Sequence, residues 1–151
     1  MPYIVGLGMA CEIAGRILDG ESKRQEGLRD EFWALLVTGI PGIRLNGHPT
    51  ERLPNTLNVS FPGTPGRSVL EAAREIAAST GSACHEGIDT PSGVLKAMGL
   101  DDATALGAVR LSVGRGTTGA QVAEAAGALI NAWKSVPKDS GSKPKSEGLG
   151  I

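Results

Sequence analysis

The sequence predicts a two-layer α+β domain, in which helices cover one face of a small and mostly antiparallel sheet. The 151 residues, 40% of them hydrophobic, are enough to bury one core. Apolar and polar side chains alternate in two short segments, whereas apolar residues recur every three or four positions in longer ones. These elements lack the long, regular strand–helix alternation of a doubly wound fold.

Two helices are expected before the first strand. Apolar residues recur at helical spacing over 4–18, a stripe that includes Cys11 and ends near 19–20. We expect this helix to pack on the domain and Cys11 to lie in its core. A second stripe covers 28–36 and ends at the glycine- and proline-rich turn 39–42.

The period then changes to two, which indicates a sheet. Segment 57–61 alternates apolar and polar residues, and 42–47 is expected to form a neighbouring strand. A helix at about 67–74 and a short strand at 75–79 should follow. A glycine loop, "ASTGSACHEG", then carries Cys84.

Two short helices and a last strand are predicted beyond that loop. Proline at the first helical position and the closing Gly99 delimit a helix within 91–99, and Asp101 caps the next one. Segment 108–113 alternates again, with Arg110 on its polar side.

The closing helix should lie across the sheet. Thr118 and Gln121 have the spacing of a capping box, and an apolar stripe covers 122–133. We therefore expect one domain over 1–136. Residues 137–151 have almost nothing to bury and are expected to be disordered.

Composition narrows the classes of partner. A net charge of −1 gives no basic surface for nucleic acid or an anionic membrane. The N-terminal segment has neither a basic leader nor an uninterrupted apolar run, so we expect no signal peptide, no membrane span and a cytoplasmic location. Two cysteines and two histidines support neither a disulfide framework nor a metal site, and His48 is interpreted as a turn residue.

Cys84 is the candidate nucleophile. A single cysteine is usually an inert small hydrophobe. Cys84, however, lies outside every apolar stripe, among glycines whose peptide N–H groups can stabilise a thiolate. His85 follows it directly, but consecutive side chains usually diverge, so its role as a base or a bystander stays open.

Arg110 is the candidate binding residue. A guanidinium in mid-strand is satisfied either by a surface salt bridge or by a bidentate carboxylate ligand, and the residues alone leave both readings open. Arg115, at the end of the same strand, is interpreted as structural.

Four segments, in this order and spacing, resemble the C-terminal part of the cysteine desulfurases of the class V aminotransferase superfamily. They are "RLPNTLNVSFPG", "ASTGSACHEG", "PSGVLKAMGL" and "AVRLSVGRGTT". The related selenocysteine lyases share this pattern, so cysteine and selenocysteine both remain open as substrates.

The resemblance implies a pyridoxal-phosphate enzyme that converts L-cysteine to L-alanine and a protein-bound persulfide. Cys84 matches the nucleophile that carries the sulfur, and Arg110 matches the arginine that clamps the substrate carboxylate. The resemblance further implies homodimers and a sulfur-acceptor or scaffold protein, with the sulfur used in iron–sulfur cluster assembly or other sulfur assembly.

One feature departs from the family pattern. The family binds the cofactor through a lysine that follows a histidine, and neither histidine here precedes a lysine. We therefore expect no cofactor-binding residue in this chain, which should be inactive alone because nothing in it can hold pyridoxal phosphate. A non-enzymatic persulfide carrier or interaction module, or a silent scaffold, is the alternative.

Overall fold

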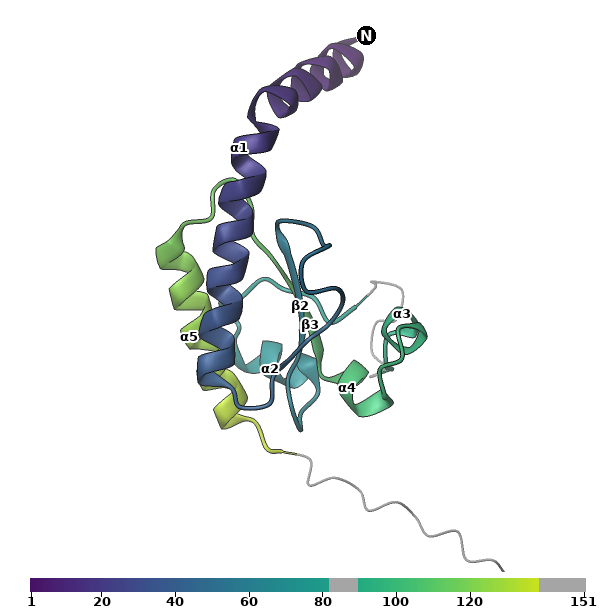
Figure 1. The fold of residues 1–151 in the computed structure, drawn as a ribbon, viewed down its shortest axis with the longest axis vertical. Helices are drawn as coiled ribbons and strands as arrows, with labels where there is room; N and C mark the ends of the chain where they lie inside the picture. Colours follow the sequence, from purple (N-terminus) through teal and green to yellow (C-terminus); the bar gives the residue numbers. More distant parts are fainter. Residues whose placement is uncertain (82–89, 139–151) are drawn as a thin grey trace, which may run out of the picture.

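The computed structural model describes residues 1–81 and 90–138, and within them a three-stranded antiparallel sheet of order β1-β2-β3 (Figure 1). Cys84, His85 and the segment 139–151 expected to be disordered lie outside the described residues. The elements in chain order are α1 (Pro2–Gly39), β1 (Arg44–Leu45), β2 (Thr56–Ser60), α2 (Gly66–Ala72), α3 (Gly93–Ala97), α4 (Asp102–Leu106), β3 (Ala108–Ser112) and α5 (Gly119–Ser135).

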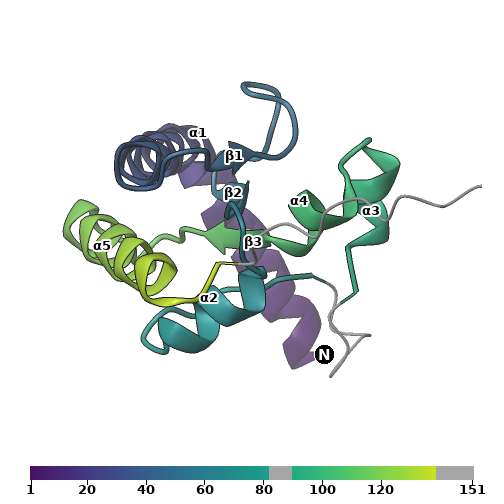
Figure 2. The same cartoon turned by 90° about the horizontal axis from the view of Figure 1, so that it is seen from below.

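Three helices cover one side of the sheet. Figure 2 shows α1, α2 and α5 on one side of the strands and the short α3 and α4 on the other. The buried core between the sheet and the helices α1, α2 and α5 contains Phe32, Leu36, Ile40, Leu57, Val59, Phe61, Val69, Val109, Leu111, Val122, Ala126 and Leu129. The α+β class predicted from the sequence is confirmed. A smaller apolar cluster joins α3 and α4 to the start of β3, and it contains Leu95, Leu100, Ala105 and Ala108.

Residues Pro2–Gly39 form one helix, so the prediction of two helices with a break near 19–20 is wrong. The segment "ESKRQE", 21–26, consists mainly of residues that favour helix, and no proline interrupts it. Glu21 also accepts hydrogen bonds from Arg24 at 2.7 Å and Gln25 at 2.7 Å, one turn ahead. These contacts stabilise the helical turn that follows Gly20, so the helix continues without a break.

The N-terminal half of α1 does not pack on the domain, contrary to the prediction. Figure 1 shows it projecting away from the sheet and the other helices. Residues 1–16 are all exposed, and Cys11, predicted to be a core residue, is exposed with them. The first α1 side chains that pack against the core are Leu28 and Phe32, so the apolar residues in 3–13 have no cover within the described residues.

The predicted strand at 75–79 is reduced to a single bridge, between Ser79 and Arg110. Ile76 N–H donates to the Ala73 carbonyl, a turn that breaks the extended path before Ser79. The caps predicted at Asp101 and Thr118 are confirmed, whereas the prediction of proline at the first helical position is wrong, because α3 begins at Gly93, two residues after Pro91. Asp101 accepts from Thr104 N–H at 2.9 Å, and Thr118 and Gln121 form a complete capping box.

Gly107, directly before β3, lies very close to the backbone of the segment that follows β2. A Cβ at Gly107 would lie 2.5 Å from the Phe61 carbonyl oxygen, although the backbone φ of −71° suits any residue. We expect Gly107→Ala to lower the free energy of unfolding by about 1–3 kcal/mol, measured by urea denaturation. Gly27→Ala in α1 is the control, because its Cβ meets no atom within 4 Å and should leave stability unchanged or raise it. Equal effects would contradict this close approach.

Candidate functional site

The polar face of β2 and β3 carries the candidate binding residue. Val109 and Leu111 are buried on the helix side of β3, whereas Arg110 between them is exposed. Because side chains alternate along a strand, Arg110 lies on the face opposite the α1–α5 core, where the period-two pattern placed it. Its partner in the antiparallel register is Asn58 of β2.

Three polar side chains near Arg110 are hydrogen-bonded to one another, although Asn46 Oδ1 is buried with no partner among the described residues. The side-chain amide of Asn46 donates to Asn58 Oδ1 and to Ser60 Oγ, both at 2.8 Å. Among the residues that the structure describes, none accepts a hydrogen bond or ion pair from the Arg110 guanidinium. A planar guanidinium left in this way on a strand can bind a carboxylate through two parallel hydrogen bonds.

Residue 79 ties the start of the glycine loop to the same position on β3. Arg110 N–H donates to the Ser79 carbonyl at 2.7 Å, and Ser79 N–H donates to the Arg110 carbonyl at 3.3 Å. The Ser79 hydroxyl donates to the Gly81 carbonyl at 2.8 Å, which fixes the first residues of the loop. Cys84 follows Ser79 by only five positions. An extended chain of five residues spans at most about 18 Å, so the backbone at 84 cannot be farther than that from Ser79.

An arginine of α1 holds the loop that follows β3. Arg24 donates to the carbonyls of Thr117 at 2.8 Å and of Gly114 and Arg115 at 3.0 Å each. Glu21 holds the same guanidinium at 2.7 Å. Arg115 was interpreted from the sequence as the structural residue at the end of this strand. The role of Arg24 was missed, because a charged residue on a helix ordinarily faces solvent.

The contact with Arg24 also changes the pKa of the Glu21 carboxyl. Hydrogen bonds first from Arg24 and then from Gln25 lower the pKa of Glu21 from 4.5 to about 2. A lowered pKa in the folded state stabilises the fold at pH values above the unfolded value, and this contribution disappears as the pH falls toward the folded value.

We therefore expect Glu21→Gln to lower the thermal midpoint at pH 7. The difference from the unchanged chain should narrow as the pH falls from about 4.5 towards about 2. The measurement is a series of thermal unfolding curves between those pH values. Glu75→Gln, which removes an exposed carboxylate after α2, is the control and should have little effect. If the difference in thermal midpoint between Glu21→Gln and the unchanged chain stays constant down to about pH 2, the role given to the Glu21–Arg24 contact is contradicted.

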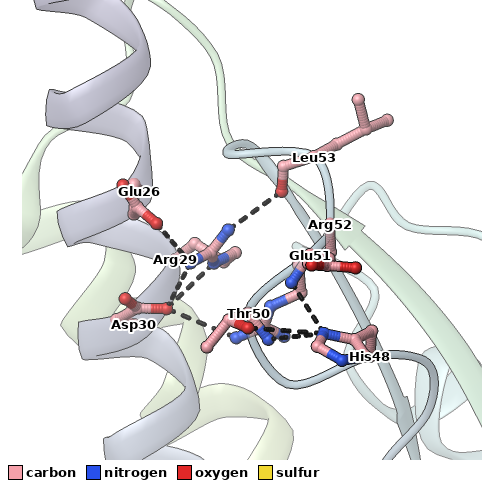
Figure 3. A network of polar contacts seen from close by, with 8 residues as sticks. All are labelled: Glu26, Arg29, Asp30, His48, Thr50, Glu51, Arg52 and Leu53. Atoms are coloured by element: carbon pink, nitrogen blue, oxygen red, sulfur yellow. Dashed lines mark hydrogen bonds and ion pairs between the residues drawn. The ribbon is translucent and has the colours of Figure 1, made fainter.

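A second polar cluster joins α1 to the loop before β2 (Figure 3). Arg29, 2% exposed, donates to the Leu53 carbonyl at 3.0 Å and contacts Asp30 at 2.8 Å. Arg52 approaches the same Asp30 carboxylate at 3.3 Å, and burial, followed by the Arg29 charge, lowers the pKa of Arg52. This cluster positions the strand entry that precedes Asn58.

His48 lies in the loop of this cluster as the turn residue that the sequence predicted. Its Nδ1 accepts from the backbone N–H of Glu51 at 2.8 Å, and Figure 3 shows the ring closing the turn. The His48 ring therefore has a structural role, because it holds the turn 48–51 together.

The lysines that the structure describes do not fit a pyridoxal-phosphate site. Lys96 pairs with Asp102 at 2.8 Å, and Lys138 lies 3.8 Å from the centre of the Trp133 ring. Lys23 and Lys134 are exposed on α1 and α5. A Schiff-base lysine needs an enclosed site that orients the cofactor, and none of these four occupies one.

Comparisons with known proteins show that the chain is homologous to part of the cysteine desulfurases. No protein-family model matches it. It is 43% identical over 115 residues to the cysteine desulfurase IscS of Acinetobacter baumannii (strain AYE), which covers 76% of this chain and 28% of the relative. It is 36% identical over 121 residues to a cysteine desulfurase of Rattus norvegicus, covering 80% of this chain and 27% of the relative.

A solved NifS-like protein matches the fold, with a TM-score of 0.75 and 28% identity over 89% of this chain and 34% of the solved one. This chain thus spans about a quarter to a third of the length of the relatives that it matches. None of the helices described here is long and apolar enough to cross a bilayer.

Proposed function

Because the chain is homologous to IscS- and NifS-like cysteine desulfurases over 76% to 80% of its length, we propose that it forms the sulfur-accepting part of such an enzyme. In this proposal the chain supplies two groups, the thiol of Cys84 and the guanidinium of Arg110. The substrate is L-cysteine, the carbon product is L-alanine, and the sulfur remains on the protein as a persulfide.

Arg110 carries this proposal. Its exposed guanidinium is left without an acceptor among the described residues, and its backbone is bonded to the segment that leads to Cys84. A substrate carboxylate held by its two-pronged donor would place the rest of the amino acid near the sheet edge that carries Ser79. A separation of five residues from Ser79 is short enough to allow Cys84 to reach the same substrate.

The chemical role proposed for Cys84 is that of a nucleophile. Its thiolate attacks the sulfur of L-cysteine, so that a sulfur–sulfur bond forms and the bond between that sulfur and the substrate Cβ breaks. The electron pair of the broken bond stays with the carbon, which takes up a proton and becomes the methyl group of alanine. A free thiol has a pKa of about 8.5, so the proton of Cys84 must leave before the attack.

The cofactor chemistry belongs to another part of the enzyme. The four described lysines do not fit a pyridoxal-phosphate site, so this chain is proposed to be inactive alone and to act with a segment that carries the cofactor. The choice of L-cysteine over selenocysteine, the acceptor of the persulfide sulfur in iron–sulfur cluster or other assembly, a homodimeric state and a cytoplasmic location remain predictions.

The sulfur-accepting role predicts where new sulfur appears. The chain is mixed with the portion of the A. baumannii IscS that it does not match, loaded with pyridoxal phosphate, and L-cysteine is added. Peptide mass spectrometry should find one added sulfur atom on the Cys84 peptide and none on the Cys11 peptide, which is the internal control. Cys84→Ala should abolish both the added sulfur and the catalytic release of alanine. Sulfur found on Cys11, or alanine formed at an unchanged rate by Cys84→Ala, would contradict the proposal.

The carboxylate-binding role predicts a defect in kcat/KM. Arg110→Ala in the same mixture should lower kcat/KM for L-cysteine roughly 10- to 100-fold, since hydrogen bonds to a charged group contribute about 1.5–3 kcal/mol. Arg110→Lys should lose less, because it keeps the charge but not the two-pronged geometry. Arg74→Ala, which removes another exposed arginine, is the control. Equal kcat/KM for Arg110→Ala and Arg74→Ala would overturn the assignment.

A further inference from the structure

Polar residues form a row across the sheet, on the face that carries Arg110. The register that pairs Leu45 with Val59 continues to Asn46, whose backbone N–H donates to the Asn58 carbonyl at 2.9 Å. Asn58 in turn pairs with Arg110, and Ser79 bridges Arg110 from the other side of β3. Residues directly opposite each other on neighbouring strands point to the same face. The row in spatial order is therefore Asn46, Asn58, Arg110 and Ser79.

The carboxamide of Asn58 is held in one orientation. Asn46 Nδ2 donates to Asn58 Oδ1 and to Ser60 Oγ, both at 2.8 Å. Asn46 is only 6% exposed, so packing as well as hydrogen bonding fixes this donor. The oxygen and the nitrogen of a carboxamide lie in one plane and point in different directions. Because Oδ1 faces Asn46 on the β1 side, Asn58 Nδ2 is turned towards β3 and Arg110.

Asn58 Nδ2 is the donor beside Arg110 that remains available to a ligand. Within 1–81 and 90–138, the hydrogen bond of the Asn58 side chain is the one that Oδ1 accepts, and its two N–H groups have no acceptor there. Asn58 is partly exposed, so these donors are not sealed in the core. Ser79, on the other side of Arg110, already donates its hydroxyl to the Gly81 carbonyl at 2.8 Å.

A carboxylate bound to Arg110 has room for a further donor. Its two oxygens offer about four acceptor positions, and a two-pronged guanidinium occupies two of them. Opposite residues of an antiparallel pair have Cβ atoms about 4.5–5.5 Å apart. The side chains of Asn58 and Arg110 can therefore reach the same small anion, and an amide adds a hydrogen bond without adding a charge.

We propose that Asn58 is a second carboxylate-binding residue, which donates Nδ2 to the carboxylate that Arg110 holds. Asn46 holds the opposite end of the carboxamide, so the donor faces the ligand before it arrives. The inference rests on the proposed function, in which an amino acid is bound through its carboxylate. It assigns to this row of the sheet the preference for a free carboxylate over an ester, since an ester lacks the negative charge that strengthens both contacts.

The first test measures binding without catalysis, by nuclear magnetic resonance of the ¹⁵N-labelled chain. The probe is L-alanine, and its methyl ester is the control ligand because it has no carboxylate. L-Alanine should shift both the Asn58 Nδ2 and the Arg110 Nε signals, and the methyl ester should shift neither. A shift at Arg110 without one at Asn58 would overturn this inference alone. No shift at either residue would overturn the carboxylate role of Arg110 and this inference with it.

The second test separates ligand binding from a structural role. In the mixture used for the sulfur-transfer assay, Asn58→Ala should lower kcat/KM for L-cysteine roughly tenfold or more. The value for L-cysteine methyl ester should change little. Asn58→Asp keeps an acceptor for Asn46 but loses the donor, so its kcat/KM for L-cysteine should fall at least as far. Ser112→Ala, at an exposed position on the same face of β3, is the control and should leave both values unchanged.

Two results of the second test would overturn the inference. One is an Asn58→Asp variant with the kcat/KM of the unchanged chain, which would mean that only the bond to Asn46 matters. The other is an equal loss for L-cysteine and its methyl ester, which would indicate a general disturbance of the sheet. Unfolding curves of each variant verify that it folds.

Discussion

The packing of the C-terminal half of α1 against α5 and the sheet is the constraint on which the rest of the structure depends. Phe32 and Leu36 are buried in this contact, and Gly39 lets the Ile130 side chain approach the helix backbone. A helix fixed in this way has a defined rotation about its axis. That rotation carries Arg24 to the loop after β3 and Arg29 to the loop before β2. One apolar contact thereby sets both loops that flank the polar face of the sheet.

The sequence predicted those parts of the fold whose partners lie within the chain. The alternation around Val109 and Leu111 placed Arg110 on the polar face, and the spacing of Thr118 and Gln121 predicted the start of α5. These patterns succeed because β3 and α5 bury their apolar sides against the same core. The exposure of Cys11 could not be predicted in this way. A periodic stripe shows that a helix has an apolar side, but it does not show what covers that side.

The polar contacts around the site were beyond sequence reasoning for a different reason. Arg24 and Arg29 bond to backbone carbonyls, which every residue has, so no pairing of residue types reveals these contacts. The separation is large, since Arg24 reaches Thr117 across 93 positions. Ser79 likewise meets Arg110 through backbone groups alone. The glycine-rich composition of 78–87 and the resemblance in this segment both predicted a functional loop, but neither predicted where the loop would be attached.

The bridge between Ser79 and Arg110 also makes the attachment of this segment independent of side-chain identity. Its two hydrogen bonds join backbone groups only, and every residue except proline carries both a backbone donor and a backbone acceptor. A substitution at position 110 that removes the guanidinium therefore leaves the bridge in place, and Ser79 keeps its position beside β3.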